Sequence, residues 1–183
     1  MTAVVAAAFA HDPAWSFLFG EDYDRLAPHF AGVLFDDRVG SGDVWVTGDV
    51  SAVAMWDPPG KAAVDRGDSG ARWRAYRALA GEPAWGRLRL YEEAVDAARP
   101  STPYWYLGVL ATAPDCQGRG RATAVMAAVL DGADSEGLDC CLETSTVANR
   151  EFYRRRRFTD VTELDMAPGP PTWWLRRPPL AAS

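Results

Sequence analysis

Apolar residues recur with two different patterns along the chain, and the two patterns separate helical from extended segments. Between residues 23 and 38, Leu26, Phe30, Val33 and Leu34 fall at the three-to-four-residue spacing of one helical face. Short, continuous apolar runs bounded by turn residues are instead typical of buried strands. The run at 104–112 is of this second kind, because it follows the turn sequence Arg99-Pro-Ser-Thr-Pro103.

These patterns alternate along the chain and predict an α/β fold. Helices are expected over residues 2–10, 23–38, 65–80, 83–98, 118–132 and 147–156. Strands are expected over residues 44–48, 51–56, 104–112, 138–145, 158–166 and 172–177. Helices between strands of mixed direction pack as an α/β sandwich around a mixed sheet. Because no repeat or low-complexity linker divides the sequence, we expect residues 1–183 to form a single domain.

Composition and charge exclude several classes of protein. With 183 residues, 48% of them hydrophobic, the chain can bury the core of one domain. Its net charge of -6 provides no basic field for nucleic acid. No apolar run is long enough to span a membrane, and the apolar start lacks the positive region of a signal peptide. We therefore expect no nucleic-acid or membrane partner.

The three cysteines argue against a disulfide framework and against a zinc site. Their number is odd, and Cys140 and Cys141 are adjacent in a predicted strand, where successive side chains point to opposite faces. The two histidines have no metal-ligand spacing to any other residue. The better interpretation is a cytoplasmic protein with buried, reduced thiols and no bound metal.

The most informative segment runs from Tyr104 to Ala122. An apolar strand ends at Pro114, and after a short turn a helix opens through the glycine-rich sequence Gln117-Gly-Arg-Gly-Arg-Ala122. A helix start without bulky side chains presents bare N–H groups at the positive end of the helix dipole, which suits a diphosphate. Such a turn on its own is also compatible with an ordinary strand-to-helix connection.

The segments that follow favour a functional interpretation of this turn over an ordinary connection. A second apolar strand, Leu138-Asp-Cys-Cys-Leu-Glu-Thr-Ser145, precedes a helix that carries Asn149-Arg-Glu-Phe-Tyr153. The order of strand, glycine-rich turn, helix, strand and tyrosine-bearing helix resembles the GNAT superfamily of N-acetyltransferases. Within it the chain is similar to the puromycin N-acetyltransferase-type subgroup. The matching pieces are Ala7-Ala-Phe-Ala-His-Asp-Pro13, Val44-Trp-Val46, Val53-Ala-Met-Trp56, Leu142-Glu-Thr-Ser145, Asn149-x-x-Phe-Tyr153 and Pro170-Pro-Thr-Trp173.

The resemblance implies both a fold and a reaction. The fold is a GNAT-type mixed central sheet of six to seven strands flanked by helices, splayed between the two central parallel strands. The reaction moves an acetyl group from acetyl-CoA, as co-substrate, to a primary amine of a small molecule. Transfer would be direct, through a ternary complex, and no metal takes part. The alternatives are a protein or peptide N-acetyltransferase and a non-catalytic CoA-binding module.

The resemblance also assigns the cofactor contacts. The backbone of Leu110, Ala111 and Thr112 would bond the pantetheine arm and the thioester oxygen. Asn149 would bond the pantetheine or cap the local turn. The turn and the helix start would hold the diphosphate through Gln117, Gly118, Arg119, Gly120, Arg121, Ala122 and Thr123. The side chains of Arg119 and Arg121 could reach phosphate as charge-assisted donors, or they could be solvated surface groups.

Two residues are candidates for catalysis. Tyr153 is the proton donor to the leaving thiolate that the resemblance implies, although a Phe-Tyr pair can also simply pack a helix. Glu143 lies in an otherwise apolar central strand, where a carboxylate is costly unless it is paired or functional. It would take the proton of the amine as a base, or it would face a helix and pair with an arginine. The arginine run from 154 to 157 is most simply a solvated turn at the end of a helix.

The sequence departs from the family pattern at two places. The usual first strand is absent, either because the sheet has lost it or because the given sequence starts late, and this leaves an apolar edge at Val44-Trp45-Val46. We expect this edge to be buried in a homodimer or under residues 1–20, since exposed edges invite pairing with another chain. The glycine that normally ends the tyrosine-bearing helix with a positive φ is Arg157, at a cost of about 1 kcal/mol.

Overall fold

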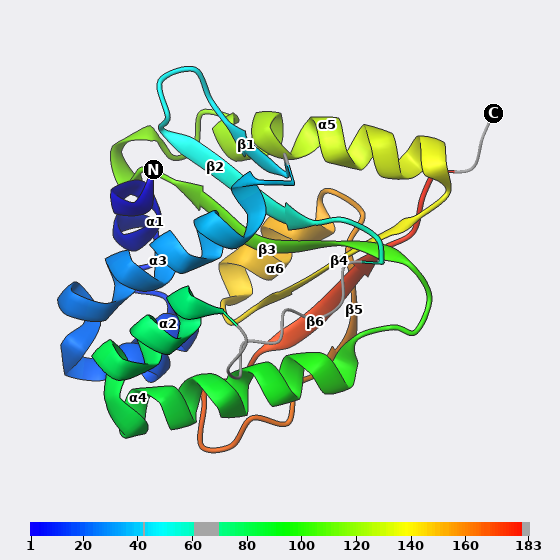
Figure 1. The fold of residues 1–183 in the computed structure, drawn as a ribbon. Coiled ribbons are helices and arrows are strands. Elements are labelled where there is room, and N and C mark those ends of the chain that lie inside the picture. The colour runs from blue at the N-terminus through cyan, green and yellow to red at the C-terminus, as the bar shows by residue number, and fades with distance from the viewer. Residues whose placement is uncertain (42, 61–69, 181–183) are drawn as a thin grey trace.

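A six-stranded mixed sheet forms the centre of the protein in the computed structural model, which describes residues 1–41, 43–60 and 70–180 (Figure 1). The strand order is β1-β2-β3-β4-β6-β5. The strands are β1 (Val44–Val46), β2 (Ala52–Asp57), β3 (Tyr104–Thr112), β4 (Asp139–Thr144), β5 (Thr159–Glu163) and β6 (Trp173–Arg177). All neighbouring strands are antiparallel except β3 and β4, which are parallel. The predicted fold class is thus confirmed.

The two parallel strands separate after a short paired stretch. They pair only from Tyr104 to Tyr106 with Asp139 to Cys141, although β3 continues to Thr112 and β4 to Thr144. The sheet is therefore splayed at its centre, as the family resemblance implied. This opening positions the candidate site.

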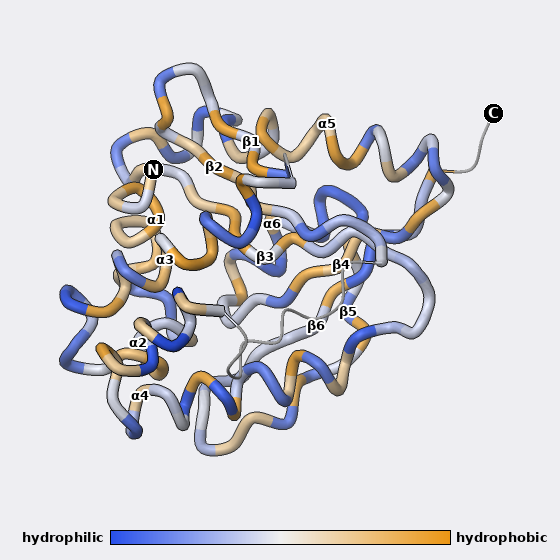
Figure 2. The backbone as a smooth tube through the Cα atoms, viewed as in Figure 1, coloured by the Kyte–Doolittle hydropathy of each residue, from blue (hydrophilic) through white to orange (hydrophobic). Residues whose placement is uncertain are grey.

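Helices cover both faces of the sheet. They are α1 (Thr2–Ala8), α2 (Pro13–Phe19), α3 (Tyr23–Val39), α4 (Ala71–Ala98), α5 (Arg121–Glu136) and α6 (Val147–Arg154), with short 3-10 turns at Gly20–Asp22 and Pro114–Cys116. The first four pack on one face, and α5 and α6 pack on the other, so that α4 and α5 lie on opposite sides of the sheet in Figure 1. Figure 2 shows hydrophobic and hydrophilic residues alternating along α4, as expected for a helix with one buried side. None of the helices in the described residues is long and apolar enough to cross a membrane.

Helix boundaries differ from the sequence prediction at the N-terminal end of the chain. The expected helix 2–10 ends at Ala8, and a second helix, α2, which we did not predict, begins at Pro13. Asp12 caps α2 by accepting hydrogen bonds from the N–H groups of Ala14 at 2.9 Å and Trp15 at 3.1 Å. Proline is favoured at the first position of a helix, where its missing N–H is not needed.

The two helices expected at 65–80 and 83–98 correspond to α4. A break at Gly81, with φ 73° and ψ 166°, divides α4 at the predicted junction. The expected residues 65–69 lie outside the described part of the chain. The helix expected to begin at residue 118 begins instead at Arg121, because Gly118 and Gly120 have φ values of 73° and 76°, outside the helical region.

The edge strand β1 is open along residues 45 and 46. Trp45 is 43% exposed and Val46 is 47% exposed, while α1 packs on α3 and β3. The expectation that residues 1–20 bury this edge is therefore wrong, because those residues cover the sheet face rather than the edge. Pairing of the edge in a homodimer stays a prediction.

A buried ion pair lies beneath β3, on the face that α3 covers. Arg38 is 1% exposed, and its guanidinium is 2.7 Å from the carboxylate of Asp57. The side chain fits because residue 108 is a glycine, where an added Cβ would lie 2.7 Å from Nη2 of Arg38. Removing one partner of such a pair leaves an uncompensated buried charge, so the pair fixes this part of the fold.

Candidate active site

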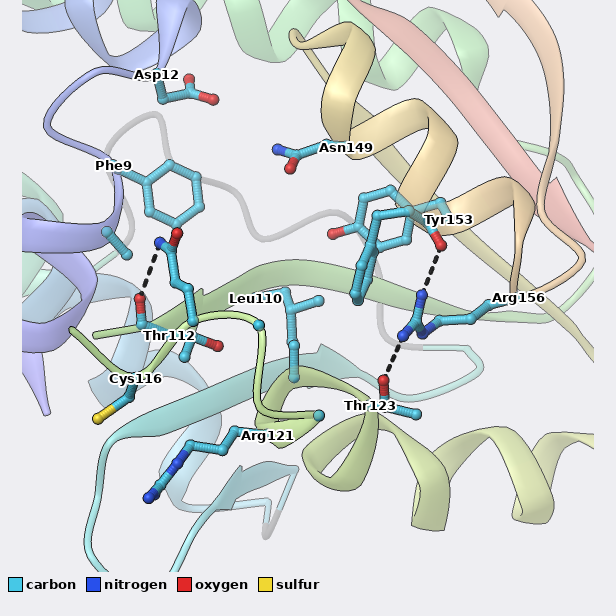
Figure 3. A pocket seen from close by; sticks show the side chains of 16 residues that line it. Phe9, Asp12, Leu110, Thr112, Cys116, Arg121, Thr123, Asn149, Tyr153 and Arg156 are labelled. Carbon is cyan, nitrogen blue, oxygen red and sulfur yellow. Dashed lines mark hydrogen bonds between the residues drawn. The ribbon is translucent and has the colours of Figure 1, made fainter. Parts of the chain in front are cut away.

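A cleft of about 420 Å³ lies on the α5 and α6 face of the sheet (Figure 3). It is lined by Ala8, Phe9, Asp12, Leu110, Thr112, Cys116, Gln117, Gly118, Gly120, Arg121, Ala122, Thr123, Asn149, Phe152, Tyr153 and Arg156. Most of the residues assigned from the sequence are thus brought together around one hollow. Arg119 and Glu143 do not line it, and neither does Ala111, which is buried in the core on the opposite face.

The glycine-rich turn forms one end of the cleft. Left-handed conformations at Gly118 and Gly120 carry the chain from β3 into α5, and neither conformation suits a residue with a Cβ atom. The first bond within α5 runs from the N–H of Ala124 to the carbonyl of Gly120, at 3.0 Å. The N–H groups of residues 121–123 come before that bond, at the positive end of the helix. This end of the cleft is therefore suited to an anion.

The side chain of Gln117 turns back toward the end of β3. Its Nε2 donates to the carbonyl of Thr112 over 3.4 Å, a long hydrogen bond that joins the turn to the strand. The cleft thus has a fixed wall of β3 on one side and the glycine turn on the other. Leu110 and Thr112 face the cleft, as expected for alternate residues of a strand.

Arg121 points away from the centre of the cleft, as Figure 3 shows. Its guanidinium donates to the carboxylate of Asp49 and to the hydroxyl of Ser51, both in the hairpin that joins β1 and β2. Hydrogen bonds from Ser51 and Arg121 hold the pKa of Asp49 well below its usual range. The arginine at the helix start therefore already has an anionic partner within the protein.

Arg156 lines the cleft instead, and no sequence motif pointed to it. Its guanidinium lies over the ring of Phe152, 3.5 Å from the centroid, and donates to the carbonyl of Phe152 at 2.7 Å. A second nitrogen donates to the hydroxyl of Thr123 in α5. The interpretation of the whole arginine run as a solvated turn is wrong at this residue. The turn after α6 folds the side chain back over the helix end.

The hydroxyl of Tyr153 points into the cleft from α6 (Figure 3). The residue is 7% exposed and packs edge-on against Phe152 and Phe158. Burial, together with the negative charge of Glu143, raises the pKa of Tyr153 above its ordinary value, and the charge of Arg156 partly offsets this. The phenol is therefore protonated at neutral pH and can act as a donor.

Asn149 and Asp12 face one another across the cleft in Figure 3. The N–H of Asn149 donates to the hydroxyl of Thr146, the N-cap of α6, so the helix start is fixed independently of the asparagine side chain. Asp12 was not singled out from the sequence as a site residue. Burial raises its pKa, and its two bonds to backbone N–H groups act in the opposite direction. The only signal for Asp12 was its place before Pro13.

Glu143 lies on the other face of the sheet, toward α4. Its carboxylate accepts hydrogen bonds from the hydroxyl of Tyr91 at 2.9 Å and from that of Tyr106 at 2.8 Å. It borders a small cavity of about 40 Å³, lined by Trp15, Leu18, Phe30, Leu34, Arg38, Tyr91, Glu92, Tyr106, Gly108 and Glu143. Tyr153 and Glu143 therefore approach the splayed region from opposite sides.

An aromatic pair stands between the two hollows. The ring of Phe9, which lines the cleft, stacks on that of Trp15, which borders the small cavity, with centroids 4.5 Å apart. Trp56, by contrast, is buried under α5 on the opposite face.

The residues that the structure describes contain no group of three His, Cys, Asp or Glu side chains that could hold a metal ion. What the arrangement provides is an anion site at a helix start, a buried phenol, and a carboxylate beyond the opening of the sheet. These groups suit the transfer of a group from a long, phosphate-bearing donor to an acceptor that arrives from the opposite face.

Comparisons with known proteins agree with this description. Residues 71–158 match the model of the acetyltransferase (GNAT) family. Among solved structures, a Corynebacterium glutamicum protein described as histone acetyltransferase HPA2 and related acetyltransferase has a TM-score of 0.70 and 19% identity, over 100% of this chain and 91% of that one. Arylalkylamine N-acetyltransferase 2 from Aedes aegypti has a TM-score of 0.66 and 10% identity, over 97% and 93% of the two chains. The polyamine N-acetyltransferase of Drosophila melanogaster has a TM-score of 0.64 and 14% identity, over 97% and 92%.

Proposed function

We propose that this chain, of which residues 71–158 match the model of the GNAT acetyltransferase family, is an acyltransferase that acetylates a primary amine of a small molecule with acetyl-CoA. Transfer is direct, within a ternary complex. The motifs from Ala7-Ala-Phe-Ala-His-Asp-Pro13 onward further suggest the puromycin N-acetyltransferase-type subgroup.

The observation that carries the proposal is the form of the 420 Å³ cleft, which has an anion site at one end and the hydroxyl of Tyr153 along its wall. Acetyl-CoA fits this order of groups, because its diphosphate is separated from its thioester by the pantetheine arm. Residues 117–123 would hold the diphosphate. Leu110, Thr112 and Asn149 would line the pantetheine, and Ala111 would contribute through its backbone alone.

Tyr153 would complete the reaction at the leaving group. When the amine attacks the thioester carbon, the C–S bond breaks and the sulfur leaves as a thiolate. A protonated phenol beside the sulfur can supply the proton that makes the thiol. Since burial favours the neutral form of Tyr153, the phenol carries that proton at neutral pH.

Glu143 would act on the acceptor. A primary amine is mostly cationic at neutral pH, and its nitrogen must lose a proton before it can attack. The carboxylate would attract the cation and take that proton, directly or through water. The cavity at Glu143 is small and has aromatic walls from Trp15, Phe30 and Tyr91, which favours a small amine over a peptide. The similar structures include enzymes named for polyamines and arylalkylamines.

Calorimetry with acetyl-CoA and an assay of thiol release over a panel of amines test the proposal together. We expect acetyl-CoA to bind and at least one small amine to be acetylated. Turnover with peptides but not with small amines would favour the protein acetyltransferase alternative. CoA binding without any turnover would favour a non-catalytic module, and no CoA binding at millimolar concentration would contradict the proposed function altogether.

The state of the cysteines bears on the cellular compartment of the protein. Cys140 and Cys141 are free and fully buried in β4. Adjacent reduced thiols of this kind are usual in reducing compartments, which supports a cytoplasmic location.

A further inference from the structure

We propose that Arg156 supplies the positive charge that contacts the diphosphate of acetyl-CoA, while Arg121 has a structural task in the hairpin between β1 and β2. This inference rests on the proposed function, because it assigns a residue to the cofactor cleft. It reverses what the sequence suggests, since Arg121 stands at the glycine turn and Arg156 is more than thirty residues away.

The turn that follows α6 determines where Arg156 points. The N–H of Arg156 donates to the carbonyl of Tyr153 at 2.8 Å, and the N–H of Phe158 donates to the same carbonyl at 3.2 Å. Between them Arg157 adopts a φ of 70°. This closing turn directs the Arg156 side chain back across the last turn of the helix, onto the ring of Phe152 and into the cleft.

The charge of Arg156 is not neutralised by the contacts that the structure describes. A carbonyl, a hydroxyl and an aromatic ring are its neighbours, and its buried Nε has no hydrogen-bond partner in the described residues. Nearby arginines differ in this respect, because Arg150 and Arg154 both pair with Asp160. Burial and the adjacent charge of Arg155 lower the pKa of Arg156, which means that the cation is held at some cost that an anion would relieve.

The bond to Thr123 brings this charge to the anion site. Thr123 is the third residue of α5, and its N–H is one of those that precede the first intrahelical bond. A guanidinium that donates to the Thr123 hydroxyl lies beside the helix start. An anion held by the N–H groups of that turn would gain a charge-assisted hydrogen bond from Arg156, and the planar guanidinium is well suited to phosphate oxygens.

Arg121 and Arg119 do not compete for this role. The Arg121 guanidinium is bound to Asp49 and Ser51 and points away from the cleft, and Arg119 does not line it. Through Asp49, Arg121 instead links the hairpin of β1 and β2 to the start of α5. Its replacement should loosen that hairpin rather than remove a phosphate contact.

The test compares CoA with pantetheine, which lacks the diphosphate, the adenosine and the 3′-phosphate. Calorimetry measures the affinity of each variant for both ligands and for dephospho-CoA, which keeps the diphosphate without the 3′-phosphate and should lose affinity as CoA does. Arg156→Gln removes the charge but keeps an amide donor for Thr123, and we expect about a tenfold loss of CoA affinity with pantetheine changed by less than about twofold. Arg156→Lys, which keeps a point charge, should recover part of the loss.

Arg155→Met is the matched control, because it removes the same charge from the neighbouring exposed position. We expect its CoA affinity to equal that of the unchanged protein within about twofold, since the Debye length of about 8 Å screens exposed charges. Thermal melting of each variant shows that it is folded. Arg156→Met, which retains the apolar stem, replaces the glutamine variant if that one does not fold.

Three results would overturn the assignment of Arg156. CoA could bind the glutamine variant as tightly as before, both ligands could lose affinity equally, or the Arg155 control could lose as much as Arg156. An equal loss for both ligands would mean that Arg156 only clamps α6 to α5. Failure of the unchanged protein to bind CoA would instead contradict the proposed function itself, and is therefore a distinct outcome.

Discussion

The hydroxyl of Tyr91, in α4, donates a 2.9 Å hydrogen bond to the carboxylate of Glu143, in β4. Tyr91 is partly buried, and both desolvation and the charge of Glu143 raise its pKa well above the ordinary value. The phenol therefore remains a hydrogen-bond donor at neutral pH. This contact connects the long helix to the carboxylate at the opening of the sheet.

Replacing the Glu143 carboxylate should give a loss of activity that depends on pH. Glu143→Gln removes both the negative charge and the proton acceptor, so we expect kcat/KM for the amine to fall at least tenfold at neutral pH. As pH rises toward the pKa of the amine, more of the acceptor is already deprotonated and the loss should shrink. Tyr91→Phe should act in the same direction with a smaller loss. A loss of equal size at every pH would show that Glu143 is structural.

For Tyr153→Phe we expect at least a tenfold lower kcat with little change in the affinity for CoA, because the lost hydroxyl acts on the leaving thiolate. Phenylalanine preserves the edge-on packing against Phe152 and Phe158, so stability should change little. Steady-state kinetics and calorimetry measure the two quantities. Unchanged turnover would assign Tyr153 to packing.

Alanine at position 108 should destabilise the fold. Its Cβ would lie 2.7 Å from Nη2 of Arg38 and 3.3 Å from Cε1 of Tyr106, and Arg38 is held at Asp57. We expect Gly108→Ala to cost about 2 kcal/mol of unfolding free energy in urea. Gly86→Ala is the control, since it lies in α4 with no heavy atom within 4 Å, and should be neutral or stabilising by up to about 1 kcal/mol. Equal effects at both glycines would contradict the steric explanation.

Glycine at position 157 should stabilise the protein. Arg157 has a φ of 70°, a conformation that costs a residue with a Cβ atom about 1 kcal/mol. Part of this gain is offset by the greater freedom of glycine in the unfolded chain, so we expect Arg157→Gly to add about 0.5 kcal/mol. Arg155→Gly, at a φ of -63°, should lower stability instead. Urea unfolding distinguishes the two signs.

The three cysteines should differ sharply in reactivity. Burial raises the pKa values of Cys140 and Cys141 to about 12, so at pH 8 they are almost entirely protonated, whereas the thiolate is the nucleophile. Cys116 is partly exposed and lines the cleft. We expect a maleimide to modify one thiol per folded chain, at Cys116, and acetyl-CoA to protect it. Mass spectrometry identifies the modified residue, and labelling that acetyl-CoA leaves unaffected would place the ligand elsewhere.

Local signals explain what the sequence could predict. The glycine turn before α5 and the positive φ at residue 157 were both readable, because each depends on a few neighbouring residues. The seven-residue helix α2 was missed despite its Asp12 cap and Pro13, since so short a segment has little periodicity. Its signals are those of a helix start, a capping aspartate followed by proline, and not a repeated apolar spacing.

Local sequence signals could not predict which side chains distant in the sequence contact each other. Arg121 is turned away by Asp49, 72 positions earlier, and Glu143 is bound by Tyr91, 52 positions earlier. The direction of Arg156 depends on the closing turn and on Thr123, which belongs to another helix. Charge and spacing identified arginines near the cleft, but only the packing of α5 against α6 shows which of them enters it.

The separation of β3 and β4 has a kinetic consequence. The cleft opens on the α5 and α6 side of the sheet, whereas the cavity at Glu143 lies on the α4 side. If acetyl-CoA occupies the cleft and the amine occupies the cavity, the two substrates would lie on opposite faces of the sheet, and neither would have to leave before the other enters. An enzyme built in this way has no need of a compulsory sequence of binding. Double-reciprocal plots for its two substrates would intersect, and each product would inhibit chiefly against the substrate whose entrance it shares.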